Sequence, residues 1–234
     1  MQVLLAEYAG FCRGVKNALK LTLAEVSRGK KVYTFGPLVH NDQVLRYLSD
    51  QGVHVLTDLQ KLEENASVVI RAHGVLPEVY RCLKEDYKNI HIVDATCPFV
   101  KRLQKIAHQH AQKGFNIIIY GDRSHPEVQA LLGWAGNKTR VIAPLQSELP
   151  EKVSSSKALL ISQTTQREDG FWALAKKLKQ IYPELEVKNT ICRATALRQN
   201  AAFKLASTVD LMLVVGDPRS ANTHKLTKVC REIV

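Results

Sequence analysis

Short runs of apolar and β-branched residues alternate with longer amphipathic segments along the whole chain. The short runs predict strands, and the longer segments, with apolar residues at helical spacing, predict helices. The predicted strands cover residues 3–5, 31–34, 68–71, 91–93, 116–120, 140–142, 158–162 and 210–215. The predicted helices cover residues 15–27, 43–51, 77–85, 99–112, 127–135, 169–182, 195–206 and 222–233. Such alternation is typical of an α/β fold with parallel sheets.

The same arrangement of polar residues recurs three times within this pattern. A cysteine stands at each of three points where a strand-like run gives way to a helix-like one, namely Cys12, Cys97 and Cys192. The residues 28 positions further on all lie in polar segments that follow another strand-like run, and they are His40, His125 and Ser220. We therefore divide the chain into α/β units at residues 1–96, 97–191 and 192–234, with residues 1–11 also able to pack with the third unit.

The third unit is expected to be incomplete. In the first two units a second polar tip follows the cysteine by 61 residues, at His73, and by 67 residues, at Thr164. The counterpart in the third unit would fall beyond Val234. We therefore expect this unit to be truncated.

Composition favours a protein of the reducing cytoplasm. The chain has no stretch near the roughly 18 apolar residues that a membrane span needs, and its apolar start lacks the basic segment of a signal peptide. The five cysteines are an odd number, which argues against a closed set of disulfides. Ligation of a metal or cluster becomes the leading explanation for some of them.

The net charge of +11 leaves several classes of partner open, including nucleic acid, an anionic small substrate and an acidic protein. The basic residues are scattered, and aromatic residues make up only 6% of the chain. We therefore interpret most of the charge as solvated surface and expect neither nucleic-acid nor membrane binding.

The three spaced cysteines have the chemistry of cluster ligands. Structural zinc sites usually take their cysteines in closely spaced pairs, whereas here each unit supplies one. Three thiolates without an obvious fourth favour an iron–sulfur cluster with one open iron. A helix N-terminus also stabilises a thiolate. The alternative is that the cysteines are small buried apolar residues, which is our interpretation of Cys82 and Cys230.

Three histidines share the loop position at which α/β proteins bind ligands. His40, His73 and His125 each follow a strand-like run. Histidine donates hydrogen bonds to phosphate oxygens and neutralises them when charged, so these residues predict an anion site. The alternative for any one of them is an ordinary solvated side chain.

Four further residues have two interpretations each. Glu127 is either a general acid or a capping acid in the first turn of the next helix, stabilised by the helix dipole. Thr164 either caps a helix or offers a hydroxyl to a ligand. Ser220 and Asn222 stand near a predicted helix start, which suits either an anion site or an ordinary cap.

Eight short segments carry a family resemblance. They are residues 10–15 (GFCRGV), 36–41 (GPLVHN), 71–75 (RAHGV), 94–98 (DATCP), 125–128 (HPEV), 162–165 (SQTT), 191–195 (ICRAT) and 220–222 (SAN). Taken together and in this order, they resemble the LytB/IspH-type 4-hydroxy-3-methylbut-2-enyl diphosphate reductases of the non-mevalonate pathway of isoprenoid biosynthesis.

The resemblance implies a trefoil of three α/β units, related by a pseudo-threefold axis, around a central [4Fe–4S] cluster. The cluster ligands would be Cys12, Cys97 and Cys192. The residues that hold the substrate diphosphate would be His40, His73, His125, Ser220, Ala221 and Asn222. Glu127 would deliver protons, and Thr164 would lie close to the substrate oxygen.

The implied reaction is a reductive dehydroxylation. Two electrons and two protons would remove the C4 hydroxyl as water, and protonation at either end of the allylic system would give isopentenyl or dimethylallyl diphosphate. The electron donor would be a small acidic flavodoxin or ferredoxin, which the positive charge of the chain suits. We expect the protein to be a monomer.

The chain departs from the family pattern in two ways. Ala221 stands where many members carry a second serine, although a backbone N–H there would still serve a phosphate. The C-terminal part that completes the third unit in typical members is absent from these 234 residues. Two alternative functions follow, a remnant that binds the diphosphate without turnover and, less favoured, a basic nucleic-acid-binding module.

Overall fold

The computed structural model describes residues 2–87, 89–143 and 157–234. The chain divides into two compact units. One consists of Phe11–Arg102, and the other combines Leu103–Val234 with the N-terminal residues up to Gly10. We describe each unit by itself and call them the first and the second unit.

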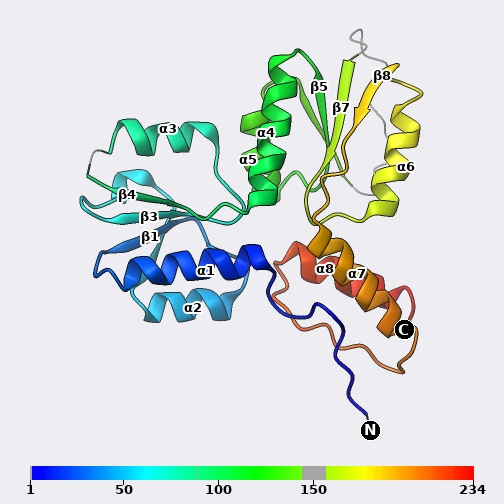
Figure 1. Ribbon diagram of the computed structural model, residues 1–234, viewed down its shortest axis with the longest axis horizontal. Coiled ribbons are helices and arrows are strands. Elements are labelled where there is room, and N and C mark those ends of the chain that lie inside the picture. The colour runs from blue at the N-terminus through cyan, green and yellow to red at the C-terminus, as the bar shows by residue number, and fades with distance from the viewer. Residues whose placement is uncertain (1, 88, 144–156) are drawn as a thin grey trace. The chain divides into compact units, whose positions relative to one another are not determined.

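The first unit is built on a four-stranded parallel sheet with the order β2-β1-β3-β4. Its strands are β1 (Val32–Phe35), β2 (Val53–Leu56), β3 (Ser67–Ile70) and β4 (His91–Asp94). Its helices are α1 (Arg13–Val26), α2 (Asp42–Asp50) and α3 (Pro77–Glu85), with a short 3-10 turn, η1, at Leu59–Lys61. Figure 1 shows α1 and α2 on one face of this sheet and α3 on the other.

Successive side chains of the central strands point to opposite faces of the sheet, which explains why helices cover both faces. Val32 and Val69 point to the face where Ala18 of α1 and Leu48 of α2 pack. Val68 and Ile70 point to the opposite face, against Leu83 of α3 and its neighbours. Because β3 is covered on both faces, all four of its residues are buried and its sequence, SVVI, is almost continuously apolar.

The second unit repeats this design. Its sheet has the order β6-β5-β7-β8, and all its strand pairs are parallel. The strands are β5 (Asn116–Tyr120), β6 (Thr139–Ile142), β7 (Lys157–Ser162) and β8 (Glu184–Val187). The helices that cover it are α4 (Pro98–Gln112), α5 (Pro126–Ala135) and α6 (Glu168–Leu178), and all but the first turn of α4 belongs to this unit.

The second sheet is also covered on both faces. Ile117 and Ile119 of β5 pack with residues of α4 and α5 on one face. Ile118 packs with α6 on the other face, where Phe171 and Tyr182 are among the largest fully buried side chains. Figure 1 shows α4 and α5 on one side of the sheet and α6 on the other.

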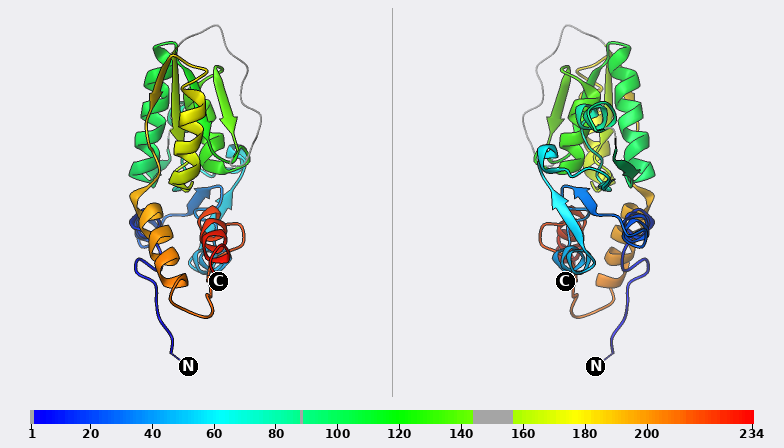
Figure 2. Two further views of the ribbon diagram at one scale, coloured as in Figure 1. Left: turned by 90° about the vertical axis from the view of Figure 1, so that its right-hand side faces the viewer. Right: turned by 90° about the vertical axis from the view of Figure 1, so that its left-hand side faces the viewer.

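Two further helices, α7 (Arg193–Ala206) and α8 (Ala221–Arg231), follow in the second unit. Figure 2 shows them next to each other, in orange and red. Ala202 and Ala206 of α7 pack with Cys230 of α8. Arg167, at the start of α6, forms an ion pair with Glu232 at the end of α8, at 2.8 Å.

The α/β class and the parallel sheets predicted from the sequence are confirmed. Strands β2 and β8 were not predicted, because each is an edge strand of only four residues, two of which are exposed. Helix α6 ends at Leu178, four residues earlier than predicted.

Two predicted strands were wrong. Residues 3–5 and 210–215 form no strand in the structure. Leu211, Leu213 and Val215 are 72%, 79% and 96% exposed. An apolar run becomes a strand only when a neighbour satisfies its N–H and C=O groups, and neither segment has a paired neighbour among the described residues.

Within residues 2–87, 89–143 and 157–234, no helix combines the length and apolar character that crossing a membrane requires.

Candidate active site

All three spaced cysteines lie at helix starts, as predicted. Cys12 and Cys192 are the N-cap residues of α1 and α7, and Cys97 directly precedes α4. The carbonyl groups of the three cysteines accept hydrogen bonds from the N–H groups of Lys16, Lys101 and Ala196, respectively. Each thiol therefore stands at the positive end of a helix dipole.

Two of these thiols approach each other in the first unit. A Cβ atom placed on Gly14 would lie 2.9 Å from Sγ of Cys97 and 3.7 Å from Sγ of Cys12. Only glycine therefore leaves both sulfur atoms room over the first turn of α1. Two thiols beside one glycine, at two helix starts, suit an iron–sulfur cluster better than an apolar core, because both cysteines are partly exposed.

Two of the three predicted histidines also meet in the first unit. The ring centroids of His40 and His73 are 4.8 Å apart, with the rings tilted by 43°. His40 follows β1 and His73 follows β3, so the parallel order of adjacent strands brings both loops to the same edge of the sheet. Two histidines at such an edge can donate to neighbouring oxygens of one anion.

Arg71 connects these two loops, a position that the sequence analysis did not predict for it. Its guanidinium packs against Gly36, where an added Cβ would lie 2.7 Å from Nη1, and its Nε donates to the Gly74 carbonyl at 3.4 Å. Burial lowers the pKa of Arg71, although an arginine remains charged. The signal for it was its position directly after β3, two residues before His73.

The second unit contains a buried carboxyl. Glu127, in the first turn of α5, is only 2% exposed. Its Oε2 accepts a hydrogen bond from the Thr164 hydroxyl at 2.6 Å, and its Oε1 accepts one from the Thr164 N–H at 2.7 Å. Burial raises the pKa of Glu127, and the two hydrogen bonds from Thr164 oppose this shift. A buried carboxyl with a raised pKa has the property that a general acid needs.

Glu127 does not cap α5. His125 is the N-cap residue, and its Nδ1 accepts a hydrogen bond from the Glu127 N–H at 3.2 Å. Because the ring caps the helix through Nδ1, its other nitrogen, Nε2, points away from the helix N–H groups. His125 is itself 8% exposed. The capping function that the sequence left open for the carboxylate thus belongs to the neighbouring imidazole.

Thr164 connects this carboxyl to the third cysteine. The Thr164 carbonyl accepts a hydrogen bond from the Cys192 N–H at 2.9 Å. His125, Glu127, Thr164 and Cys192 thus form a continuous series of hydrogen-bonded residues in the second unit. The series joins three segments that are distant in sequence, and local propensity does not predict it.

Gln163 supports the same region and was also missed from sequence. Its Oε1 accepts a hydrogen bond from the Asp122 N–H at 2.9 Å, in the loop that leads to His125. Its Nε2 donates to the Thr165 hydroxyl at 2.9 Å. Gln163 is fully buried, so a polar side chain at a strand end was the available signal.

The predicted residues of the third repeat form the start of α8. Ser220 is its N-cap residue, and its hydroxyl accepts from the Thr223 N–H at 3.4 Å. Ala221 and Asn222 are the first two helical residues, and both are partly exposed. In the described part of the second unit, no hydrogen bond joins these three residues to Glu127 or Thr164.

Comparison with known proteins identifies the family of the chain. Residues 3–234 match the family described as LytB protein. The chain belongs to the LytB family. It is 42% identical to the 4-hydroxy-3-methylbut-2-enyl diphosphate reductase of Thermoanaerobacter sp. (strain X514), over 99% of this chain and 81% of that protein. It is 37% identical to the enzyme of the same name from Clostridioides difficile (strain 630), over 100% of this chain and 84% of that protein.

Solved structures of LytB-type enzymes are similar in fold. One, described as (E)-4-hydroxy-3-methyl-but-2-enyl diphosphate reductase, the terminal enzyme of the non-mevalonate pathway, gives a TM-score of 0.74 at 34% identity, over 99% of this chain and 82% of that one. The Plasmodium falciparum enzyme, described as an E-1-hydroxy-2-methyl-but-2-enyl-4-diphosphate reductase, gives a TM-score of 0.86 at 28% identity, over 95% of this chain and 71% of its own.

Proposed function

We propose that this LytB-family chain is a 4-hydroxy-3-methylbut-2-enyl diphosphate reductase, an oxidoreductase of isoprenoid biosynthesis. It converts its substrate to isopentenyl and dimethylallyl diphosphate in the last step of the non-mevalonate pathway. The observation that carries the proposal is the buried Glu127 carboxyl, held by Thr164, which is in turn hydrogen-bonded to the N–H of Cys192. This series joins a buried carboxyl to the backbone of a cysteine, a residue whose thiol can ligate iron.

Binding of the substrate begins with its diphosphate. His40, His73 and His125 donate hydrogen bonds to the phosphate oxygens, and protonation of their rings adds positive charge. The N-terminus of α8 adds Ser220, Asn222 and the backbone N–H of Ala221, and the helix dipole favours the anion there. These contacts leave the C4 hydroxyl free for the reaction.

Glu127 delivers the protons. The overall change consumes two electrons and two protons, breaks the bond from C4 to oxygen, and releases water with the allylic diphosphate product. Because burial raises its pKa, this carboxyl holds its proton more readily than an exposed one and can protonate the departing hydroxyl, and the second proton goes to one end of the allylic system. Thr164 orients the carboxyl through its hydroxyl and its N–H.

The donor set of the chain fits an iron–sulfur cluster. Cys12, Cys97 and Cys192 would hold a [4Fe–4S] cluster, and the room that Gly14 leaves beside the first two thiols supports this choice. When bound, such a cluster supplies single electrons and an open, Lewis-acidic iron for the substrate oxygen. Exclusion of water around Glu127 is the contribution of the chain, since its side chain is 2% exposed.

The remaining parts of the proposal concern organisation and partners. The chain comprises the three α/β units predicted from the sequence, at residues 1–96, 97–191 and 192–234, and these three units are arranged as a trefoil. A small acidic flavodoxin or ferredoxin supplies the electrons, the protein works in the cytoplasm, and it is a monomer. The repeated strand order of the two complete sheets supports the division into repeats.

The deciding experiment is anaerobic reconstitution with iron and sulfide, followed by turnover with a reduced viologen dye. We expect a brown protein that converts the substrate to both products, identified by mass spectrometry. The Cys97→Ser variant should lose both the cluster absorbance and the activity. A variant that kept its cluster would remove Cys97 from the ligand set. A wild-type protein that bound the diphosphate without turnover would instead be a non-catalytic member of the family.

A further inference from the structure

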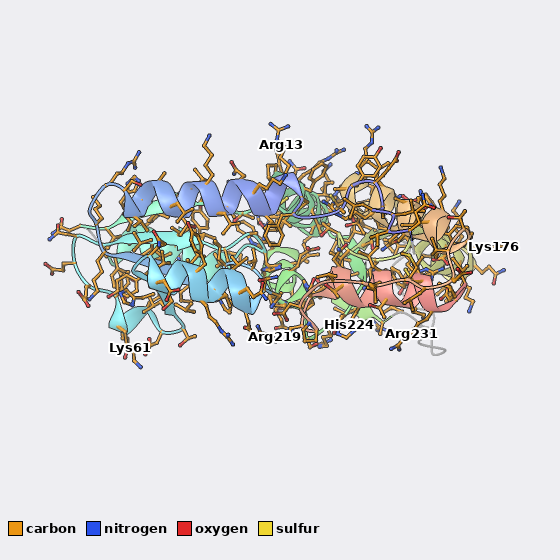
Figure 3. All side chains as sticks on the ribbon, turned by 90° about the horizontal axis from the view of Figure 1, so that it is seen from below. Arg13, Lys61, Lys176, Arg219, His224 and Arg231 are labelled. Atoms are coloured by element: carbon orange, nitrogen blue, oxygen red, sulfur yellow. The ribbon has the colours of Figure 1, made fainter. Side chains whose placement is uncertain are left out.

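Helix α1 carries an exposed basic stripe that none of the functions above uses. Arg13, Lys16 and Lys20 are all exposed, and at 3.6 residues per turn they fall on one face of the helix. The opposite face contains the buried residues Ala18 and Thr22. Figure 3 shows Arg13 pointing outward from the start of α1. The stripe begins directly after Cys12, the proposed cluster ligand.

The charges of this stripe are available to a partner. None of its three cations forms an ion pair with any residue that the structure describes. The other two helices that begin after a cysteine differ. In α4, Lys101 pairs with Asp94 at 2.6 Å, and in α7, Arg198 donates to the carbonyls of Ala194 and Gly10.

An exposed aromatic ring lies beside the stripe. Phe11 directly precedes Cys12 and is 43% exposed. The first turn of α1 contains no acidic residue, whereas the first turn of α6 contains Glu168 and Asp169. An aromatic residue next to unpaired cations has the composition of a protein-binding surface, with an apolar centre and a charged rim.

We propose that Phe11 and the stripe formed by Arg13, Lys16 and Lys20 are the docking surface for a small acidic electron-carrier protein. This inference rests on the proposed reductase function. Two reduced carriers dock in turn, and each is oxidised by one electron. The two electrons, with two protons, convert the substrate to its allylic product and water.

The charge of the stripe and its position next to Cys12 together favour an acidic electron carrier as the partner. Positive side chains on one helix face attract an acidic protein over a Debye length, which accelerates the encounter and orients it. Because the stripe starts next to Cys12, a carrier that docks there would place its redox centre near one end of the proposed ligand set.

The first test measures binding without turnover. Oxidised flavodoxin is titrated with the full chain by calorimetry at low ionic strength, using wild type and the K16E/K20E double variant. We expect the double variant to bind on the order of ten-fold more weakly, with the difference shrinking as salt is added. The matched control is K176E/K177E on α6, which makes the same charge change at two exposed lysines. Its affinity should stay within about two-fold of wild type.

The second test separates docking from chemistry. With reduced methyl viologen as the donor, wild type, K16E/K20E and the control should turn over equally. With reduced flavodoxin, only K16E/K20E should show a KM for flavodoxin raised on the order of ten-fold. Arg13→Gln and Phe11→Ala test the end of the surface nearest Cys12, and their iron and sulfide content is measured to confirm that the cluster is intact.

Two results would overturn the docking surface. One is flavodoxin binding by K16E/K20E that equals wild type. The other is an equal loss in K176E/K177E, which would mean attraction to the net charge alone. Failure of the viologen reaction in wild type would count against the reductase function, while the calorimetric comparison would still test the surface.

Discussion

The two complete α/β units have the same strand order and the same sequence pattern at one loop, yet they offer different chemistry. His40 lies five residues after the end of β1 and is followed two residues later by Asp42. His125 lies five residues after the end of β5 and is followed two residues later by Glu127. Asp42 is exposed, whereas Glu127 is 2% exposed.

The residue that caps each helix produces part of this difference in burial between Asp42 and Glu127. In the first unit Asn41 caps α2 and accepts the Val44 N–H, so Asp42 is the first residue of the helix. In the second unit His125 caps α5, so Glu127 is the second residue of its helix. A shift of one position turns a helical side chain by about 100°, so that the two acids point in different directions.

The strand next to each loop, β7 in the second unit and β3 in the first, produces the rest of the difference in burial between the two acids. The register of β7 on β5 and of β3 on β1 makes Ser162 the counterpart of Ile70. The residue two positions after each is Thr164 in the second unit and Ala72 in the first. Only the second unit thus places a hydroxyl opposite its acid. The lesson is that one loop pattern yields an exposed acid or a buried acid, depending on its cap and its neighbouring strand.

The largest expected effect is on turnover. Glu127→Gln removes the buried acid and should lower viologen-driven turnover by about 10²–10⁴-fold while the cluster absorbance and diphosphate binding are kept. Asp42→Asn, the same change at the equivalent position of the first unit, should leave turnover within about two-fold, as expected of an exposed side chain. Steady-state kinetics on both variants makes the comparison. Normal turnover in Glu127→Gln would remove this carboxyl from the mechanism.

The next effect concerns Thr164, whose counterpart is Ala72. Thr164→Val removes the hydroxyl hydrogen bond to Glu127 and should lower turnover by about ten-fold. Because that hydrogen bond opposes the raised pKa of Glu127, its loss should move the alkaline limb of the pH–rate profile to higher pH. Thr164→Ser keeps the hydroxyl and should retain the wild-type profile. An unchanged limb in the valine variant would mean that Thr164 does not act through this carboxyl.

A smaller effect is expected in the first unit. His40→Ala removes one proposed phosphate donor and should weaken binding of the diphosphate by about ten-fold, in line with the loss of one hydrogen bond to a charged group. The cluster spectrum should not change. His54→Ala, on the edge strand β2, is the control, because His54 is exposed and its ring contacts only Tyr33 among the described aromatic residues. Calorimetry with inorganic diphosphate measures both variants. A spectral change without weaker binding would contradict the proposed position of His40.

The smallest effect is on stability. Burial raises the pKa of Glu127, so the folded state holds a proton that the unfolded chain releases at lower pH. The contribution of Glu127 to the free energy of unfolding is therefore fully present at acidic pH, and it is lost as the pH rises through the pKa of Glu127 in the folded state. The free energy of unfolding should fall with rising pH more steeply in wild type than in Glu127→Gln, which cannot titrate. Denaturant unfolding across the pH range measures the difference, and parallel curves would show that the carboxyl ionises normally.

Much of the fold was predictable because its determinants are local. Strand β5 and helix α3 have the predicted bounds, since a β-branched run and a proline at the first helical position mark them directly. The edge strands β2 and β8 were missed because each is only four residues long, which leaves too few positions for a clear strand pattern. Residues 210–215 form a longer, mostly apolar run, yet they form no strand, because β pairing depends on a neighbouring strand that local sequence does not specify.

The sequence by itself determined where the reactive side chains stand along the chain. The three cysteines at helix starts and the histidines after strands follow from local junctions, whose signals are contained in a few adjacent residues. Only the tertiary structure decided which of two equivalent acids is buried, and that Arg71 and Gln163 hold their loops in place. Burial and long-range hydrogen bonds depend on segments that meet only after folding, and these contacts make Glu127, a first-turn residue, a buried carboxyl with a raised pKa.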